Sequence, residues 1–230
     1  MIKTIAFDAD DTLWHNERIF LSAKRKYQHL LAGYHDHEWI ERRLDEAESR
    51  NILHFGYGIK GFTLSMIETA CELTEGRITG NEIREIIGFA REMLESPIEV
   101  LDGVRETITR LAPDYSLMVI TKGDLFDQEA KLARSGIGDY FNRVEIVSKK
   151  VRTTYDDILD RNGIDAAEFV MVGNSLKSDI LPVLETGARA VYIPYETEWF
   201  HEMVSDEELR GKDFATLEHI SGLPELLRNI

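Results

Sequence analysis

The sequence predicts an α/β fold: a Rossmann-like parallel sheet with helices on both faces, together with a small all-helical domain. Three observations carry this prediction. Short apolar runs rich in strand-forming residues occur at the N-terminus and through the second half of the chain. Segments of helical length separate these runs, a pattern typical of buried parallel strands joined by crossover helices. Between about residues 16 and 97 the strand-like runs disappear and helical periodicity replaces them.

The expected strands are five short runs, at residues 2–7, 117–120, 144–147, 169–172 and 190–193. Segments long enough for helices follow at residues 124–134, 154–161, 175–185 and 219–228. Because the runs are predominantly apolar, we expect the helices to bury the sheet on both faces.

Residues 16–97 are expected to form the all-helical domain, inserted after the first strand of the sheet. Apolar residues recur at helical spacing from Ile19 to Leu31 and from Ile83 to Met93, and two more helices are expected at residues 38–49 and 62–73. About 80 residues are enough for a separate small core. Pro97 marks the exit, because proline ends a helix. The sheet domain then comprises residues 1–15 and 98–230.

Composition and charge exclude several classes of protein. Of the 230 residues, 43% are hydrophobic and 30% charged, which is ordinary for a globular protein and excludes disordered and low-complexity classes. A formal net charge of −15 argues against nucleic-acid and anionic-membrane partners. No apolar run reaches the roughly 18 residues of a membrane span, and the acidic residues at 8–11 do not fit a signal peptide. We therefore expect a cytoplasmic protein.

Polar residues follow four of the expected strands, at the point where each strand ends. Ligands of open parallel sheets bind outside the carboxyl ends of the strands, so these residues are expected to share one site. They are Asp8, Asp10 and Thr12 after the first run, Thr121, Lys122 and Gly123 after the second, Lys149 and Lys150 after the third, and Asn174 and Asp179 after the fourth.

The acidic cluster favours a divalent cation and a phosphoryl group. Asp8, Asp10 and Asp11 lie within four residues and repel one another unless a cation lies among them. Mg²⁺ takes oxygen ligands, and Asn174 and Asp179 would add an amide oxygen and a carboxylate. An aspartate can also attack phosphorus while a second carboxylate transfers protons. The alternative for this run alone is an acidic cap before a helix.

The residues after the second and third strands offer groups that bind phosphate. Thr121 supplies a hydroxyl, and Lys122 and Gly123 lie at a strand-to-helix turn whose N–H groups bind anions. Lys149 or Lys150 would neutralise phosphate charge. Taken singly, these residues fit a capped turn and two solvated lysines equally well.

A glycine loop at residues 56–61, with the sequence GYGIKG, matches the pattern GxGxxG. It follows a helical segment instead of a strand, so it does not indicate a dinucleotide site. Its glycines allow backbone conformations with positive φ, and we expect Tyr57 and Lys60 to contact the leaving group of a substrate. The alternative is a turn that only connects two helices.

Taken in order, these motifs resemble those of the haloacid dehalogenase superfamily, over essentially the whole chain. In that family a strand precedes DxDxT, which Asp8, Asp10 and Thr12 match here. A second strand ends in Thr or Ser, here Thr121, and a lysine follows a third strand, here Lys150 or Lys149. The fourth motif is typically GDxxxxD, here the segment GNSLKSD at residues 173–179.

The resemblance implies a Mg²⁺-dependent phosphatase of a small phosphorylated metabolite, with residues 16–97 as a helical cap over the catalytic core. It implies that Asp8 is the nucleophile, that Asp10 is the acid and base, and that Thr121 and Lys150 hold the phosphoryl oxygens. The implied metal-binding residues are Asp8, Asp10 through its main-chain carbonyl, and Asn174, with Asp179 close by. The implied substrate-binding residues are Thr12, Lys122, Gly123, Tyr57 and Lys60.

Two positions depart from the family pattern. Asn174 stands where the family usually has Asp, which removes a negative charge and leaves an amide oxygen as the ligand. The third-motif lysine lacks the proline that commonly follows it, so its identity stays open. The spacing to Tyr155 allows either lysine, and Lys150 is favoured, with Lys149 next. Asp10 argues against the dehalogenase branch, because halide displacement needs no proton-transfer acid two residues after the nucleophile.

Three other activities stay open at the level of sequence. One is a phosphomutase of the same family. Another is a phosphonate hydrolase, which would need a Schiff-base lysine on the cap, where Lys60 is the candidate. The third is a non-catalytic binding module on this fold. The sequence leaves the substrate and the oligomeric state open.

Overall fold

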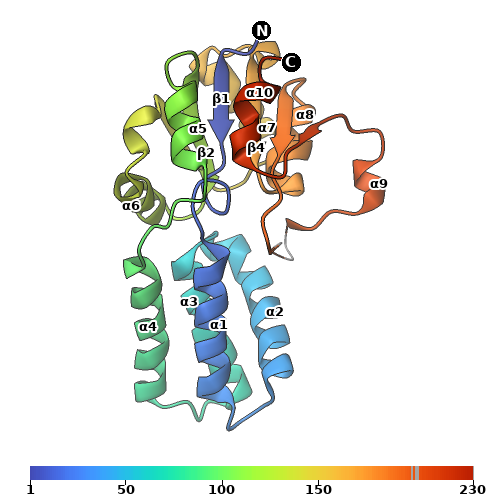
Figure 1. Ribbon diagram of the computed structural model, residues 1–230. Helices are drawn as coiled ribbons and strands as arrows, with labels where there is room; N and C mark the ends of the chain where they lie inside the picture. The colour runs from blue at the N-terminus through green and yellow to red at the C-terminus, as the bar shows by residue number, and fades with distance from the viewer. Residues whose placement is uncertain (198, 200–201, 230) are drawn as a thin grey trace. The chain divides into compact units, whose positions relative to one another are not determined.

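The computed structural model describes residues 1–197, 199 and 202–229. The described residues form two compact units, whose helices and several of whose strands are labelled in Figure 1. The first comprises Met1–Glu17, Ile98–Lys122 and Gln128–Ile230, and we call it the sheet unit. The second comprises Arg18–Pro97 and Gly123–Asp127, and we call it the helical unit.

A parallel β-sheet forms the centre of the sheet unit (Figure 1). Its strand order is β3-β2-β1-β4-β5-β6, and every neighbouring pair is parallel. Figure 1 labels β1, β2 and β4 of this sheet. The strands are β1 (Thr4–Phe7), β2 (Ser116–Lys122), β3 (Arg143–Val147), β4 (Phe169–Gly173), β5 (Arg189–Tyr192) and β6 (Ala215–Thr216). The first five lie where strands were predicted, which confirms the α/β fold with a Rossmann-like parallel sheet. The two-residue strand β6 has no predicted counterpart.

Residues of the central strands alternate between two hydrophobic layers, one on each face of the sheet. In β1, Ile5 and Phe7 belong to one layer and Ala6 to the other. Successive side chains of a strand point to opposite faces, so a strand buried on both faces is apolar at nearly every position. Helices α5 (Val104–Leu111) and α10 (Leu223–Leu226) contribute to the first layer, and α7 (Arg152–Asn162) and α8 (Leu181–Leu184) to the second.

Two segments of the sheet unit that were predicted as continuous helices each consist of a short turn followed by a four-residue α-helix. Leu176–Ile180 forms a π-helical turn before α8, and Ile220–Gly222 forms a 3-10 turn before α10. A proline lies in the first turn of each of these α-helices. Because Pro182 has no N–H to donate, the carbonyl of Ser178 accepts a hydrogen bond from the Tyr155 hydroxyl at 2.9 Å. Helix α6 (Leu125–Ser135) matches a prediction, whereas α5 and α9 (Asp206–Leu209) do not.

Four long helices build the helical unit, at the positions that the sequence pattern predicts. They are α1 (Glu17–Leu31), α2 (His37–Phe55), α3 (Ile59–Leu73) and α4 (Gly80–Glu95). They bury a separate core in which Tyr27, Phe62 and Met66 are at most 2% exposed. Among the described residues, no helix is long and apolar enough to cross a bilayer.

Candidate active site

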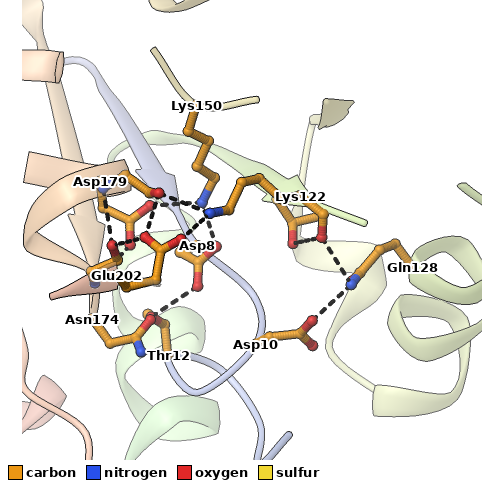
Figure 2. A network of polar contacts seen from close by, with 12 residues as sticks. Asp8, Asp10, Thr12, Lys122, Gln128, Lys150, Asn174, Asp179 and Glu202 are labelled. Atoms are coloured by element: carbon orange, nitrogen blue, oxygen red, sulfur yellow. Dashed lines mark hydrogen bonds and ion pairs between the residues drawn. The ribbon is translucent and has the colours of Figure 1, made fainter. Parts of the chain in front are cut away.

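Polar side chains from several loops of the sheet unit gather at the carboxyl ends of its central strands (Figure 2). Strand β1 lies between β2 and β4, so the residues that follow these three strands are close in space. Asp8 directly follows β1, Lys122 ends β2 and Asn174 directly follows β4. The loop after β3 adds Lys150, which reaches the carboxylates of this group. The strand ends that the sequence pattern singled out therefore meet in one place.

Lys150 is buried between two carboxylates. Its Nζ donates to Oδ1 of Asp8 and, at 2.7 Å, to Oδ1 of Asp179, and its side chain is 1% exposed. Burial would lower the pKa of Lys150, but the charges of Asp179 and Asp8 outweigh burial and raise it, so the ammonium stays charged. Lys149 is exposed. Of the two candidate lysines, Lys150 is therefore the one at the site.

Asp8 lies in an environment that disfavours its charge. Burial raises the pKa of Asp8 to about 7, against the lowering effect of Lys150 and with a further increase from the charge of Asp179. One carboxylate oxygen accepts from Lys150, and the other accepts from the Thr12 hydroxyl at 3.3 Å. Additional positive charge at this second oxygen would favour the ionised form of the carboxyl.

The side-chain amide of Asn174 faces oxygen atoms of Asp8, Asp10 and Thr12. One terminal atom of this amide lies 3.2 Å from Oδ2 of Asp8, 3.3 Å from the main-chain oxygen of Asp10 and 3.1 Å from Oγ1 of Thr12. As an NH₂ group this atom would donate to these oxygens. As the amide oxygen, it completes a set of three facing oxygens with Asp8 and Asp10, which a hard cation such as Mg²⁺ would stabilise. The residues present therefore fit a magnesium site.

Asp179 lies beside this oxygen set and supports it. Its Oδ1 accepts from Lys150, and its Oδ2 accepts from the main-chain N–H of Ser175 at 3.0 Å. A Cβ at Gly173 would lie 2.3 Å from this Oδ2, so only glycine fits there. Within the described ranges, no three His, Cys, Asp or Glu side chains form a metal-binding group. Asp179 thus fixes Lys150 and the turn that carries Asn174.

The Asp10 carboxylate is held by three donors. It accepts from Nε1 of Trp14 at 2.8 Å, from Nε2 of Gln128 at 2.8 Å and from Nζ of Lys131 at 3.1 Å. The Gln128 and Lys131 side chains come from one face of α6 and are buried, and the sequence pattern gave no sign of this role. These donors orient a carboxylate that lies two residues after Asp8.

The third acid of the cluster, Asp11, accepts hydrogen bonds from main-chain N–H groups. Its Oδ1 accepts from the main-chain N–H groups of Asn16 at 2.8 Å and Glu17 at 3.1 Å. Its φ of 62° is left-handed, which aspartate tolerates in turns. Burial raises the pKa of Asp11 to about 6. Asp11 therefore closes the turn after β1 through backbone amides.

Other predicted site residues lie at the end of β2 or in the helical unit. Thr121 is buried, and its hydroxyl donates to the carbonyl of Lys122 at 3.4 Å. Tyr57, Lys60 and Gly123 belong to the helical unit. There Nζ of Lys60 lies 2.9 Å from Oδ1 of Asp124.

The glycine loop between α2 and α3 needs its glycines for its backbone path. Gly56 and Gly58 have φ values of 73° and 111°. A Cβ at Gly61 would lie 2.8 Å from the main-chain oxygen of Gly56. These constraints explain the GxGxxG pattern without a nucleotide.

Curated relatives of the chain are phosphatases at low sequence identity. A phosphatase of 5-amino-6-(5-phospho-D-ribitylamino)uracil from Escherichia coli is 24% identical, with 84% of this chain and 83% of the relative covered. A glyceraldehyde 3-phosphate phosphatase from Pyrococcus abyssi is 28% identical, with 85% and 82% covered. The mouse N-acylneuraminate-9-phosphatase is 24% identical, with 82% and 81% covered.

Solved structures and a family model agree with the motifs. A haloacid dehalogenase-like family hydrolase from Xanthomonas campestris has a TM-score of 0.88 and 42% identity, with 99% of this chain and 91% of that chain covered. A 2-haloacid dehalogenase from Pseudomonas syringae shares the fold, with a TM-score of 0.66 and 23% identity over 100% and 99% of the two chains. The model of the haloacid dehalogenase-like hydrolases matches residues 2–183. The resemblance seen in the motifs is thus confirmed, and this chain belongs to the haloacid dehalogenase-like hydrolase family.

Proposed function

We propose that this protein is a Mg²⁺-dependent phosphatase that hydrolyses a small phosphorylated metabolite through an aspartyl-phosphate. The observation that carries the proposal is the setting of Asp8. One of its oxygens is paired with the buried Lys150, and the other faces the Asn174 amide. The phosphatases among its relatives support the same reaction class. The net charge of −15 favours a small-molecule substrate over nucleic acid, and we expect the protein in the cytoplasm.

In the proposed first step, a carboxylate oxygen of Asp8 attacks phosphorus and the bond between phosphorus and the ester oxygen breaks. Protonated Asp10 gives its proton to the leaving oxygen, which departs as an alcohol. In the second step, Asp10 takes a proton from the water that attacks phosphorus. The bond between phosphorus and the Asp8 oxygen breaks, inorganic phosphate leaves, and the Asp8 carboxylate and the protonated Asp10 are restored.

The remaining side chains bind and orient. Lys150 and the Thr121 hydroxyl would hold phosphoryl oxygens, and the three donors on Asp10 keep its carboxylate in one orientation. Mg²⁺ held by Asp8, the Asp10 carbonyl and Asn174 would supply positive charge against the phosphoryl oxygens. The helical unit is the proposed cap, which would exclude water while the ester bond breaks.

One alternative activity is disfavoured by a contact in the helical unit. A phosphonate hydrolase would need a neutral amine on the cap to form a Schiff base. The candidate, Lys60, forms an ion pair with Asp124 and lies 5.7 Å from the ring centroid of Phe126. These contacts already engage the amine that a Schiff base would need.

The test is turnover of phosphate esters by the purified protein, with Mg²⁺ and with a chelator. The panel would contain p-nitrophenyl phosphate and triose, polyol and sugar phosphates. Asp8→Asn should reduce kcat below about a thousandth of the wild-type value, because an amide does not form the aspartyl-phosphate. Asp10→Asn should lower it by about a hundredfold or more.

Asp11→Asn is the matched control, since Asp11 accepts backbone N–H groups and an amide oxygen still can. This variant should keep most of the activity. Near wild-type turnover by Asp8→Asn would disprove the mechanism. Absence of turnover by the wild-type protein on every ester would overturn the proposed function.

A further inference from the structure

A carboxylate that no sequence motif indicated joins the site from the loop after β5. Glu202 forms an ion pair with Nζ of Lys122 and accepts hydrogen bonds from the hydroxyls of Ser175 and Ser178 (Figure 2). The Glu202 and Lys122 side chains are 13% and 15% exposed. Lys122 also donates to the Ser178 hydroxyl at 2.8 Å. We call these four residues the Glu202 cluster.

Three residues of the Glu202 cluster are sequence neighbours of residues in the proposed phosphoryl site. Lys122 directly follows Thr121, Ser175 directly follows Asn174, and Ser178 directly precedes Asp179. In Figure 2 the Lys150 and Lys122 side chains both point into the group of carboxylates, Lys150 to Asp8 and Asp179 and Lys122 to Glu202.

The partners of Glu202 have the composition of an anion site. An ammonium group and two hydroxyls converge on one carboxylate, and these are the donors that bind carboxylates and phosphates. Burial alone would raise the pKa of Glu202, but the charge of Lys122 and the three hydrogen bonds outweigh burial and lower it, so the carboxylate is ionised. The protein therefore fills this anion site with its own side chain.

Without a bound cation the side chains around the site leave a negative excess. The described residues of the site include three lysines and four carboxylates. Lys122 forms an ion pair with Glu202, Lys131 with Asp10, and Lys150 with both Asp8 and Asp179. Mg²⁺ would offset the negative excess beside Asp8 and Asn174, whereas the charge of Glu202 is balanced by its ion pair with Lys122. A substrate with a second anionic group beside its phosphate would place that group near Glu202. Like charges in a partly buried site repel strongly, which is a way to reject a competing ligand.

We propose that Glu202 is a specificity-determining residue that selects phosphate monoesters with an uncharged, hydroxyl-bearing leaving group. It would reject monoesters that carry a carboxylate or a second phosphate next to the reacting phosphate. Lys122, which would otherwise bind such a group, is neutralised by Glu202. This inference rests on the proposed phosphatase function.

The test compares kcat and KM for a matched substrate pair, glycerol 3-phosphate and 3-phosphoglycerate, in which a hydroxymethyl group is exchanged for a carboxylate. The wild-type enzyme should prefer glycerol 3-phosphate. Glu202→Gln keeps the size and an acceptor oxygen and removes the charge. It should shift the kcat/KM ratio toward 3-phosphoglycerate by about tenfold or more, chiefly through a lower KM.

Two further variants separate charge from structure. Adding Lys122→Met to Glu202→Gln should abolish the shift, because the released cation is gone. Tyr195→Phe is the control in the same loop. It removes a hydroxyl that lies 2.6 Å from Nδ1 of His15 and changes no charge, so it should leave the ratio unchanged. An unchanged ratio in Glu202→Gln, or a shift that survives in the double variant, would overturn the inference. Equal losses of kcat/KM on both substrates would mean that Glu202 only stabilises the turn after β4 and does not select the substrate.

Binding measurements distinguish failure of this inference from failure of the proposed function. If the wild-type protein hydrolyses no ester, the proposed function is wrong, and calorimetry with inorganic phosphate and 2-phosphoglycolate takes the place of kinetics. Glu202→Gln should then tighten binding of 2-phosphoglycolate by about tenfold relative to inorganic phosphate. An equal change for both ligands would count against a selective role.

Discussion

Nζ of Lys150 lies 2.7 Å from Oδ1 of Asp179, and both side chains are 1% exposed. The same ammonium group pairs with Asp8. Asp8 and Asp179 are 171 residues apart in the chain, and one buried cation holds their carboxylates at the same strand ends. The pair therefore links the nucleophile candidate to the turn that carries Asn174.

The first prediction concerns stability. Lys150→Met removes the cation and leaves two buried carboxylates facing each other, so it should lower the free energy of unfolding by about 3 kcal/mol at neutral pH. Lys149→Met is the matched control because Lys149 is exposed, and its effect should stay within about 0.5 kcal/mol. Urea unfolding without Mg²⁺ measures both. Equal stability of the two variants would show that the buried pair contributes nothing to the fold.

The second prediction concerns the metal. Asn174→Ala removes the proposed amide ligand and should weaken Mg²⁺ binding by about tenfold or more, whereas Asn174→Asp adds negative charge and should tighten it. Calorimetric titration with Mg²⁺ and the Mg²⁺ dependence of turnover provide independent measurements. Asn81→Ala, an exposed position in the helical unit, is the control. Unchanged Mg²⁺ affinity in both Asn174 variants would remove this residue from the ligand set.

The parts of the fold and site that sequence predicted have local causes. Strands β1, β2 and β4 are buried on both faces, so their residues are apolar in unbroken runs, and the ligand-binding edge follows from the direction of a parallel sheet. Asp8 and Asn174 directly follow such runs, and Lys150 follows the partly exposed strand β3. Their convergence could therefore be predicted without knowing the strand order.

The residues that sequence did not predict depend on tertiary packing. Gln128 and Lys131 lie on a helix with several other polar residues, and only the packing of α6 shows that this pair is buried against Asp10. Glu202 lies ten residues after the end of β5, in a segment without periodic pattern. Its partners are known only once β2 and the turn after β4 are placed together.

The third prediction concerns the glycine loop of residues 56–61 as part of the proposed cap. Lys60→Ala and Tyr57→Ala should lower kcat/KM far more for a good metabolite substrate than for p-nitrophenyl phosphate, because the loop would contact the leaving group. The Lys60 side chain is 59% exposed, so the loss of its ion pair with Asp124 should cost little stability. Lys26→Ala, which breaks an exposed pair with Glu92 in the same unit, is the control. Equal losses on both substrates, or no loss, would reduce the loop to a connection.

The fourth prediction uses two glycines of the helical unit with opposite expectations. Gly61→Ala should destabilise the protein by about 2 kcal/mol, because the new Cβ would lie 2.8 Å from a main-chain oxygen. Gly88→Ala in α4 meets no atom within 4 Å and should stabilise it by up to about 1 kcal/mol. Thermal unfolding measures both changes. A neutral Gly61→Ala would mean that the backbone of the loop can shift at little cost.

The fifth prediction concerns a buried carboxyl in α2. Glu48 is 6% exposed, and its Oε2 accepts no hydrogen bond from the residues that the structure describes. Burial raises the pKa of Glu48 from 4.5 to about 7, although the charge of Lys24 lowers it. Between these two pH values the unfolded chain loses a proton that the folded chain keeps. Stability attributable to Glu48 therefore falls as pH rises, by about 3 kcal/mol in total.

Glu48→Gln should remove this dependence, because glutamine has no ionisable carboxyl. The variant should have nearly the wild-type free energy of unfolding below about pH 5 and exceed it by about 3 kcal/mol at pH 8. The exposed Glu41 lies on the same helix, and Glu41→Gln should show no such difference between the two pH values. Urea unfolding of the three proteins across this range measures the effect. A gain in Glu48→Gln that is the same at both ends of the range would show that Glu48 is ionised in the folded protein.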